Sequence, residues 1–264
     1  MSGPLATPPP YPAGGSALLA DRVVLVTAAA GTGIGFAAAR RCVDEGATVV
    51  IADLHERRLE ESADRLSEIG GTRPITALCD VTDQSAVDAM FDLVYREHGR
   101  LDVLINNAGL GGTTRLVEMT DEKWSAVLDV TLNGTMRCTR EALRRMPSNG
   151  GGVLVNNASV LGWRAQDGQA HYAAAKAGVM ALTRCAAIEG AGDGIRVNAV
   201  APSLAMHPFL SKVMDQEVLD ELTTHEAFGR SAEPWEVANV MVFLASDYSS
   251  YLTGEVISVS SQRA

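Results

Sequence analysis

Seven short runs of apolar, mostly β-branched residues recur along this chain, and they constrain its fold more than any other feature. Several of them, such as VVLV at 23–26 and VVIA at 49–52, are apolar without interruption. Strands of a parallel sheet are buried on both faces and have this unbroken pattern, whereas half-exposed strands alternate apolar and polar residues. The runs predict seven strands: Val23–Val26, Thr48–Ala52, Ile75–Leu78, Val103–Ile105, Val153–Val155, Arg196–Val200 and Val256–Val259.

Segments with helical spacing separate most of these runs. In 56–69, for example, Leu59, Ala63 and Leu66 fall on one helical face. Strands that alternate with helices indicate βαβ units. We therefore predict an α/β protein, a single Rossmann-type doubly wound domain with a seven-stranded parallel sheet and helices on both faces. The expected helices cover Ile34–Glu45, Glu56–Ile69, Ser85–Glu97, Trp124–Met146 and Tyr172–Ile188.

The composition of the chain changes only near its N-terminus. Residues 1–20 are rich in Pro, Gly and Ala, which is typical of a flexible leader. No linker-like stretch follows, so residues 21–264 are expected to form one domain.

Charge, hydropathy and cysteine spacing argue against several classes of protein. The net charge of −10 disfavours nucleic acid and anionic membranes as partners. No run of about 18 apolar residues could span a membrane, and the N-terminus lacks the features of a secretory signal, so a cytoplasmic protein is expected. The four cysteines, at 42, 79, 138 and 185, form no CxxC pair. They are expected to be free thiols, and no metal site is predicted.

A glycine-rich loop follows the first run and leads directly into a helix. It extends from Thr27 to Gly35 and includes Gly31 and Gly33. Glycines at this place let the backbone approach a pyrophosphate, whose charge the amide groups and the helix N-terminus would stabilise. The alternative is a tight strand-to-helix turn without a ligand.

Asp53 ends the second run, 18 residues after Gly35. A carboxylate at this position accepts hydrogen bonds from the adenosine ribose hydroxyls and repels the 2′-phosphate of NADP, so NAD is the expected cofactor. Asp53 could instead cap the helix that starts near Glu56. Arg57 and Arg58 leave NADP open as the less favoured cofactor, because they could turn toward a phosphate.

Two further loops follow the third and fourth runs, at the end of the sheet where ligands bind in open α/β folds. Asp80 and Val81 follow the third run, and Asp80 could accept a hydrogen bond from the adenine amino group. The string Asn106-Asn107-Ala108-Gly109 follows the fourth. Each of these residues alone is common in turns, so only the set indicates a cofactor groove.

The residues expected to carry the chemistry come after the fifth run. Ser159 is followed 13 residues later by Tyr172, and Lys176 comes four residues after that. A spacing of four places Tyr172 and Lys176 on one face of a helix. A nearby ammonium lowers the pKa of a tyrosine toward neutrality, so Tyr172 could act as acid and base while Ser159 orients the reacting oxygen. The alternative is a half-buried tyrosine beside a solvated lysine.

Together these motifs resemble the short-chain dehydrogenase/reductase family from about Leu18 to the end of the chain. IRVNAVAP at 195–202 and LTG at 252–254 also match. The resemblance implies hydride transfer between a nicotinamide and a secondary alcohol or ketone. It makes Tyr172 the acid and base, gives Lys176 the tasks of lowering its pKa and holding the nicotinamide ribose, and lets Ser159 position the substrate. The implied cofactor contacts are Thr27, Gly31, Gly33, Ile34, Gly35, Asp53, Asp80, Val81, Asn107, Ala108, Gly109, Tyr172, Lys176, Pro202 and Ala205.

Three departures from the family's motifs fall in the expected site. Ala28 replaces the first glycine of the usual TGxxxGxG loop, which here carries one extra residue. Thr131 stands in the place of the family's fourth catalytic residue, an asparagine, and Asn133 follows two positions later. The Thr131 hydroxyl could hold the water attributed to that asparagine. His207 replaces the threonine that binds the carboxamide, and it could face the substrate or be structural.

Residues 203–230 correspond to the segment that covers the substrate in this family. This segment is amphipathic, which predicts a lid over a hydrophobic substrate or simple packing onto the domain. With SVLGWRA at 159–165 and EPWEV at 233–237, the departures resemble a narrower group, bacterial short-chain dehydrogenases that act on acyl-CoA derivatives of the steroid C and D rings. This resemblance suggests a small-molecule substrate such as a CoA thioester. Arg164 and Arg115 are candidate anchors for it, although surface arginines are usually only solvated.

Two other functions remain open at this point. One is a 3-oxoacyl-CoA or acyl-carrier-protein reductase that uses NADPH, which the net charge of −10 disfavours. The other is a nucleotide-binding regulator that lost its chemistry, which the retained Ser159, Tyr172 and Lys176 disfavour. The family usually assembles through its two long mid-chain helices, so the resemblance implies a homodimer or homotetramer.

Overall fold

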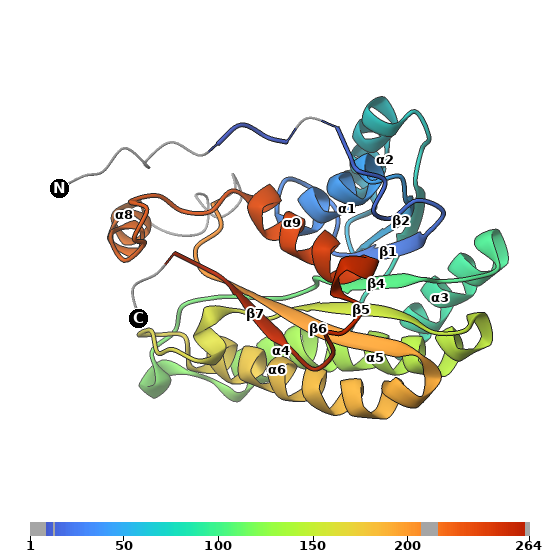
Figure 1. Ribbon diagram of the computed structural model, residues 1–264. Helices are drawn as coiled ribbons and strands as arrows, with labels where there is room; N and C mark the ends of the chain where they lie inside the picture. Colours follow the sequence, from blue (N-terminus) through green and yellow to red (C-terminus); the bar gives the residue numbers. More distant parts are fainter. Residues whose placement is uncertain (1–8, 13, 207–215, 262–264) are drawn as a thin grey trace.

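A parallel sheet forms the centre of the molecule in a computed structural model that describes residues 9–12, 14–206 and 216–261 (Figure 1). The sheet has seven strands in the order β3-β2-β1-β4-β5-β6-β7, and every neighbouring pair is parallel. The predicted doubly wound sheet is therefore confirmed. The strands are β1 (Val23–Thr27), β2 (Thr48–Asp53), β3 (Ile75–Leu78), β4 (Val103–Asn106), β5 (Gly152–Asn157), β6 (Ile195–Pro202) and β7 (Val256–Val259).

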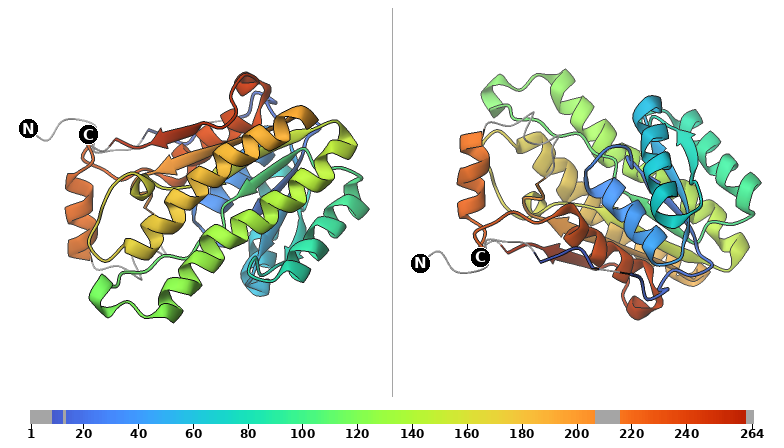
Figure 2. Two further views of the ribbon diagram at one scale, coloured as in Figure 1. Left: turned by 90° about the horizontal axis from the view of Figure 1, so that it is seen from below. Right: turned by 90° about the horizontal axis from the view of Figure 1, so that it is seen from above.

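Helices cover both faces of the sheet, as Figure 2 shows from below and from above. One face carries α1 (Ile34–Asp44), α2 (Glu56–Gly70) and α9 (Pro234–Ala245). The other face carries α3 (Gln84–His98), α4 (Asp121–Leu128), α5 (Gly134–Arg145) and α6 (Ala170–Gly190). The short helix α8 (Gln216–Thr224) lies beside the sheet rather than on either face. None of the described helices is long and apolar enough to cross a membrane.

Each face of the sheet has its own large hydrophobic core, and a smaller cluster joins Val179 and Met180 of α6 to β6. On the α1 side, Leu59 and Leu66 of α2 belong to the same buried cluster as Met241 of α9, and α1 lies between the two helices. On the α3 side, Phe91 of α3 packs with Met146 after α5. The strands contribute side chains to both cores, which explains why their sequences are apolar without alternation.

Three elements differ from the sequence-based expectation, one of them α8, a helix in the segment that was expected only to be an amphipathic lid. The expected helix over 124–146 is interrupted, because a single π-helical turn, Asp129–Asn133, separates α4 from α5. Directly after the π turn, the Thr135 hydroxyl of α5 donates to the carbonyl of Thr131 at 2.8 Å. A π turn is how a helix accommodates one extra residue. The helix α9 was not predicted, because it is apolar on most sides and has no clear helical periodicity.

The described part of the N-terminal segment packs against α1. Leu19 is completely buried, and the amides of Ser16 and Leu18 donate to Glu45 at 2.8 and 3.2 Å. Tyr11 donates a hydrogen bond to Asp44. The flexibility of residues 1–20 stays a prediction. Of the expected lid, residues 207–215, which include His207, lie outside the described residues.

Candidate active site

The sequence-predicted site residues meet at the carboxyl ends of β1, β4 and β5. After β1 the chain moves outward to β2 and β3 and then returns to place β4 beside β1. This reversal creates the crevice in which doubly wound sheets bind their ligands. Thr27, Asn106 and Asn157 are the last residues of the three strands.

The glycine loop makes a close turn between β1 and α1. A Cβ at Gly35 would lie 2.2 Å from the carbonyl oxygen of Ala28, so only glycine allows the helix to start this close to the loop. Gly31 has φ +102°, a backbone conformation that other residues rarely adopt. The N-cap residue of α1 is Gly33, which has no side chain that could accept from the amides of the first helical turn. These amide groups therefore remain available to an anion. This cradle fits the pyrophosphate of a dinucleotide.

Thr27 joins this loop to the segment after β4. Its hydroxyl accepts hydrogen bonds from the amides of Asn107 and Ala108 at 2.9 and 3.2 Å. The Asn107 side chain donates to the carbonyl of Ala28 at 3.1 Å. The predicted residues Thr27, Asn107 and Ala108 therefore form one hydrogen-bonded unit that holds the glycine loop.

Asp53 lies at the edge of the loop and is partly buried. Its two carboxylate oxygens accept from the amides of Ala30 and His55 at 3.1 and 3.0 Å. Burial raises the pKa of Asp53, and the hydrogen bond from Ala30 and the charge of Arg58 partly offset this. The residue that caps α2 is His55 rather than Asp53. The carboxylate is thus fixed beside the loop, where a ribose would lie.

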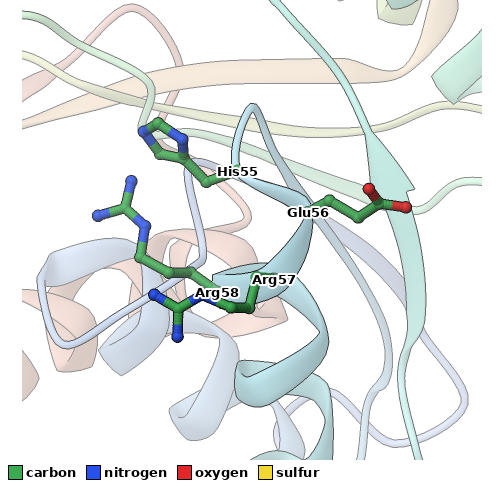
Figure 3. Close-up of a pocket in the computed structure, with 4 residues that line it drawn as sticks. All are labelled: His55, Glu56, Arg57 and Arg58. Carbon is green, nitrogen blue, oxygen red and sulfur yellow. The ribbon is translucent and has the colours of Figure 1, made fainter.

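A surface pocket of about 510 Å³ opens next to Asp53 and is lined by His55, Glu56, Arg57 and Arg58. Figure 3 shows His55 and the two arginine side chains on the same side of the start of α2, away from Glu56. The Arg57 guanidinium pairs with Glu61 at 2.6 Å. The pocket therefore places positive charge close to the adenosine end of the predicted cofactor site.

Arg65 of α2 is a loop contact that sequence analysis missed. Its guanidinium donates to the carbonyl of Gly31 at 2.8 Å and stacks 3.9 Å from the centroid of the Phe36 ring. The amide of Gly31 donates to the Ser62 hydroxyl at 3.0 Å. The sequence offered no signal for these contacts, because they join residues about 30 positions apart on different elements.

Ser159, Tyr172 and Lys176 come together as predicted. Ser159 follows β5, and the other two residues lie on the first turns of α6. The Ser159 hydroxyl accepts from the amide of Leu161 at 3.2 Å and lies close enough to the Tyr172 phenol to lower its pKa. Lys176 is buried, its Nζ lies 5.5 Å from the centroid of the Tyr172 ring, and it donates to the carbonyl of Asn157 at 2.5 Å.

Burial controls the ionisation of these groups in the protein alone. It raises the pKa of Tyr172 to about 12, although the neighbouring Ser159 hydroxyl acts in the opposite direction. It lowers the pKa of Lys176 to about 8. The expected lowering of the tyrosine pKa by the ammonium is therefore not found, because desolvation dominates and the amine points at the Asn157 carbonyl.

Thr131 lies on the π turn close to Lys176. Its buried hydroxyl donates to the carbonyl of Leu110 at 3.2 Å and accepts from the amide of Leu110 at 3.0 Å. A Cβ at Gly109 would lie 3.5 Å from the Lys176 Nζ and 3.7 Å from the Thr131 Oγ1. Asn133, by contrast, donates to Asp129 at 3.1 Å. Of the two candidates for the family's asparagine, the structure brings Thr131 to the site.

The remaining predicted residues border the crevice. The Asp80 carboxylate accepts from the amide and hydroxyl of Thr82 at 2.9 and 2.7 Å, which fixes its orientation. Val81 packs against Gly134 at the start of α5. Pro202 ends β6, and Ala205 forms a bridge to Ala232.

The two candidate substrate arginines lie on loops after β4 and β5. Arg115 precedes a short 3₁₀ turn, and the backbone of Arg164 bonds to the carbonyl of Val160 at 2.9 Å. Both residues are exposed. Within the described residues, no group of three or more His, Cys, Asp or Glu side chains could hold a metal ion.

Comparison with known proteins decides the family. A sequence model described as enoyl-(acyl carrier protein) reductase matches residues 28–261. The chain belongs to the short-chain dehydrogenase/reductase family. The predicted resemblance is confirmed, and the protein is an oxidoreductase of CH–OH groups in a family that uses nicotinamide cofactors.

Individual relatives match over nearly the whole chain. A Mycobacterium tuberculosis protein named (5R,7aS)-5-hydroxy-7a-methyl-1-oxo-2,3,5,6,7,7a-hexahydro-1H-indene-carboxyl-CoA reductase is 63% identical over 249 residues, 94% of this chain and 95% of the relative. Cis-4-hydroxycyclohexanecarboxylate dehydrogenase of Sinomonas cyclohexanicum is 41% identical and covers 91% and 95%. The crystal structure of a short chain dehydrogenase from Mycobacterium smegmatis is 58% identical, with a TM-score of 0.86 over 97% of this chain and 98% of that one.

Proposed function

We propose that the protein is an NAD(H)-dependent oxidoreductase that interconverts a secondary alcohol and a ketone on a hydrophobic, cyclic, steroid-derived acyl-CoA. The observation that carries this proposal is the group formed by Ser159, Tyr172 and Lys176 beside a glycine loop shaped for a dinucleotide. The likeness to the M. tuberculosis reductase, whose name describes a bicyclic CoA ester with a hydroxyl and a keto group, supports the substrate class.

The side chains of the site divide the chemistry among them. A bound nicotinamide supplies the carbon that gives or accepts the hydride. The Ser159 hydroxyl donates a hydrogen bond to the substrate oxygen and holds it near Tyr172. The Tyr172 phenol gives this oxygen a proton in reduction, and the Tyr172 phenolate takes one from it in oxidation. Since burial raises the pKa of Tyr172, the phenol is protonated at neutral pH and acts as the acid. In oxidation, the Lys176 ammonium stabilises the phenolate.

Two observations support NAD over NADP. The Asp53 carboxylate is held in place by two backbone amides, so it cannot easily turn away from a 2′-phosphate. Arg57, which could have neutralised such a phosphate, is paired with Glu61. Arg58 remains close to Asp53 and is the residue that would favour NADPH.

The substrate side of the crevice supports a hydrophobic ligand. Large apolar side chains are exposed on the loops after β4 and β5: Leu110, Leu116, Val117 and Trp163. We propose that these residues receive the ring system under a lid formed by about residues 203–230, and that Arg115, Arg164 and His207 contact the CoA ester. An acyl-carrier-protein reductase is not favoured, because a net charge of −10 is unsuited to an acidic carrier.

Replacement of Tyr172 by Phe tests the proposal. The Tyr172→Phe variant loses the transferable proton, so kcat for a cyclic hydroxyacyl-CoA should fall by about 1,000-fold. Fluorescence titration should show that wild type and variant bind NADH with equal affinity. Both should bind NADH about tenfold more tightly than NADPH, or tighter still. Full turnover by the variant would contradict the mechanism, and preference for NADPH would contradict the role of Asp53.

A further inference from the structure

Ala28 is an alanine in a backbone conformation that favours glycine. Its φ is +49°, in the left-handed region. An L-residue there brings its Cβ close to the backbone and is held only where surrounding contacts compensate. Ala28 stands where the family's loop has its first glycine, so this protein keeps the turn without the residue that makes the turn easy.

The carbonyl group of Ala28 is held from two sides. It lies against the Cα of Gly35, where a Cβ would approach within 2.2 Å, and it accepts a hydrogen bond from the Asn107 Nδ2 at 3.1 Å. Asn107 thus holds the strained residue in place. Its own orientation decides whether the loop keeps the shape that receives a pyrophosphate.

Asn157 fixes the orientation of Asn107. The Asn157 Nδ2 donates to the Asn107 Oδ1 at 2.9 Å, which leaves the Asn107 Nδ2 directed at Ala28. The main-chain carbonyl of Asn157 also accepts from the Lys176 Nζ at 2.5 Å. Asn157 is therefore the one described residue that bonds both to Lys176 and to the side chain that holds Ala28.

We propose that Asn157 is a positioning residue that keeps the cofactor loop in its binding shape by holding Asn107 on the strained Ala28. The two residues form a compensating pair: an alanine in a glycine conformation, and the asparagine that ends β5. The consequence for cofactor binding rests on the proposed function, whereas the coupling between Ala28 and Asn157 does not.

A double-mutant cycle tests the proposal. The variants are Ala28→Gly, Asn157→Leu and the two combined, and the readouts are NADH affinity by fluorescence and urea unfolding without nucleotide. We expect Asn157→Leu to weaken NADH binding about tenfold and to raise KM for NADH more than it lowers kcat. Ala28→Gly should restore most of this affinity and most of the lost urea midpoint, because glycine adopts the turn without help. If the role of Asn157 were only structural, Ala28→Gly would not restore these properties.

Asn149 provides the matched control. Its Nδ2 donates to the carbonyl of Leu101 at 2.8 Å at the opposite end of the sheet, so Asn149→Leu also removes an amide hydrogen bond. Ala28→Gly should not rescue this variant. Additive effects of Ala28→Gly and Asn157→Leu in both readouts would overturn the proposal, as would an Asn157→Leu variant that behaves like wild type. Should Asn157→Leu fail to fold, Asn157→Ser is subjected to the same cycle. Failure of the wild type to bind NADH would count against the proposed function alone, since the unfolding cycle needs no nucleotide.

Discussion

The Lys176 side chain is buried, and its burial destabilises the folded protein to a measurable extent. The Lys176 pKa falls from 10.5 to about 8 because the charged amine is desolvated. Between about pH 8 and pH 10.5, the Lys176 side chain is protonated in the unfolded chain but not in the folded protein. The destabilisation by Lys176 is therefore present in full below about pH 8 and is lost as the pH rises toward 10.5. Tyr172, with its pKa raised to about 12, titrates above this window.

Replacement of Lys176 by Met should remove this pH dependence. Between pH 7.5 and 9.5, the free energy of unfolding of wild type should gain about 2 kcal/mol relative to Lys176→Met. Urea unfolding at the two pH values measures the difference. The buried thiols of Cys42, Cys79 and Cys138 have raised pKa values but are common to both proteins, so their contributions cancel. A difference that stays constant with pH would show that Lys176 is not desolvated.

At the scale of residues, the spacing of nearby residues predicted the site well, whereas contacts between residues far apart in the sequence could not be predicted. The four-residue spacing of Tyr172 and Lys176 already places both on one helix face, and the structure has them there. The roles of Asn157 and Arg65 depend on partners 50 and 34 positions away, respectively. The raised pKa of Tyr172 likewise depends on burial, which spacing does not report.

At the scale of elements, the strands were the most predictable part. Their apolar runs are short and end at turn residues, so the observed strands contain every predicted run. The π turn between α4 and α5 was not predictable, because the side-chain pattern of 124–146 is helical throughout. The helix α9 has a capping box of Glu233 and Glu236, but its buried apolar sequence resembles a strand as much as a helix.

The approach of α1 to the end of β1 is the element contact on which the cofactor cradle depends. In Gly35→Ala, the new Cβ would lie 2.2 Å from the Ala28 carbonyl oxygen and 2.5 Å from the Asn107 Nδ2. Since a backbone atom cannot yield as a flexible side chain can, we expect a loss of about 3 kcal/mol in unfolding free energy together with weaker NADH binding. Urea unfolding and fluorescence titration measure the two effects. The control is Gly192→Ala, whose Cβ meets nothing within 4 Å and should change stability by less than about 0.5 kcal/mol.

At the scale of the whole molecule, one sheet separates the two large cores. The helices of the α1 side and of the α3 side do not share a core, but the same strands contribute alternate side chains to both. A perturbation in one core therefore reaches the other through the hydrogen-bonded sheet. The single domain over 21–264 stays a prediction from length and composition, and the shared sheet leads us to expect that the two faces unfold together.

Cooperative unfolding follows from this shared sheet. Phe91 is completely buried in the core on the α3 side, and Trp235 lies in the first turn of α9 on the opposite face. In a background in which Trp235 is the only tryptophan, Phe91→Leu should lower stability by about 1 kcal/mol. The urea midpoints from Trp235 fluorescence and from far-ultraviolet circular dichroism should shift together at a fixed protein concentration. Leu66→Val, on the same face as Trp235, provides the matched change and should give the same coincidence. If Phe91→Leu moved the dichroism midpoint and left that of Trp235 in place, the two faces would unfold separately, and the single-domain prediction would be wrong.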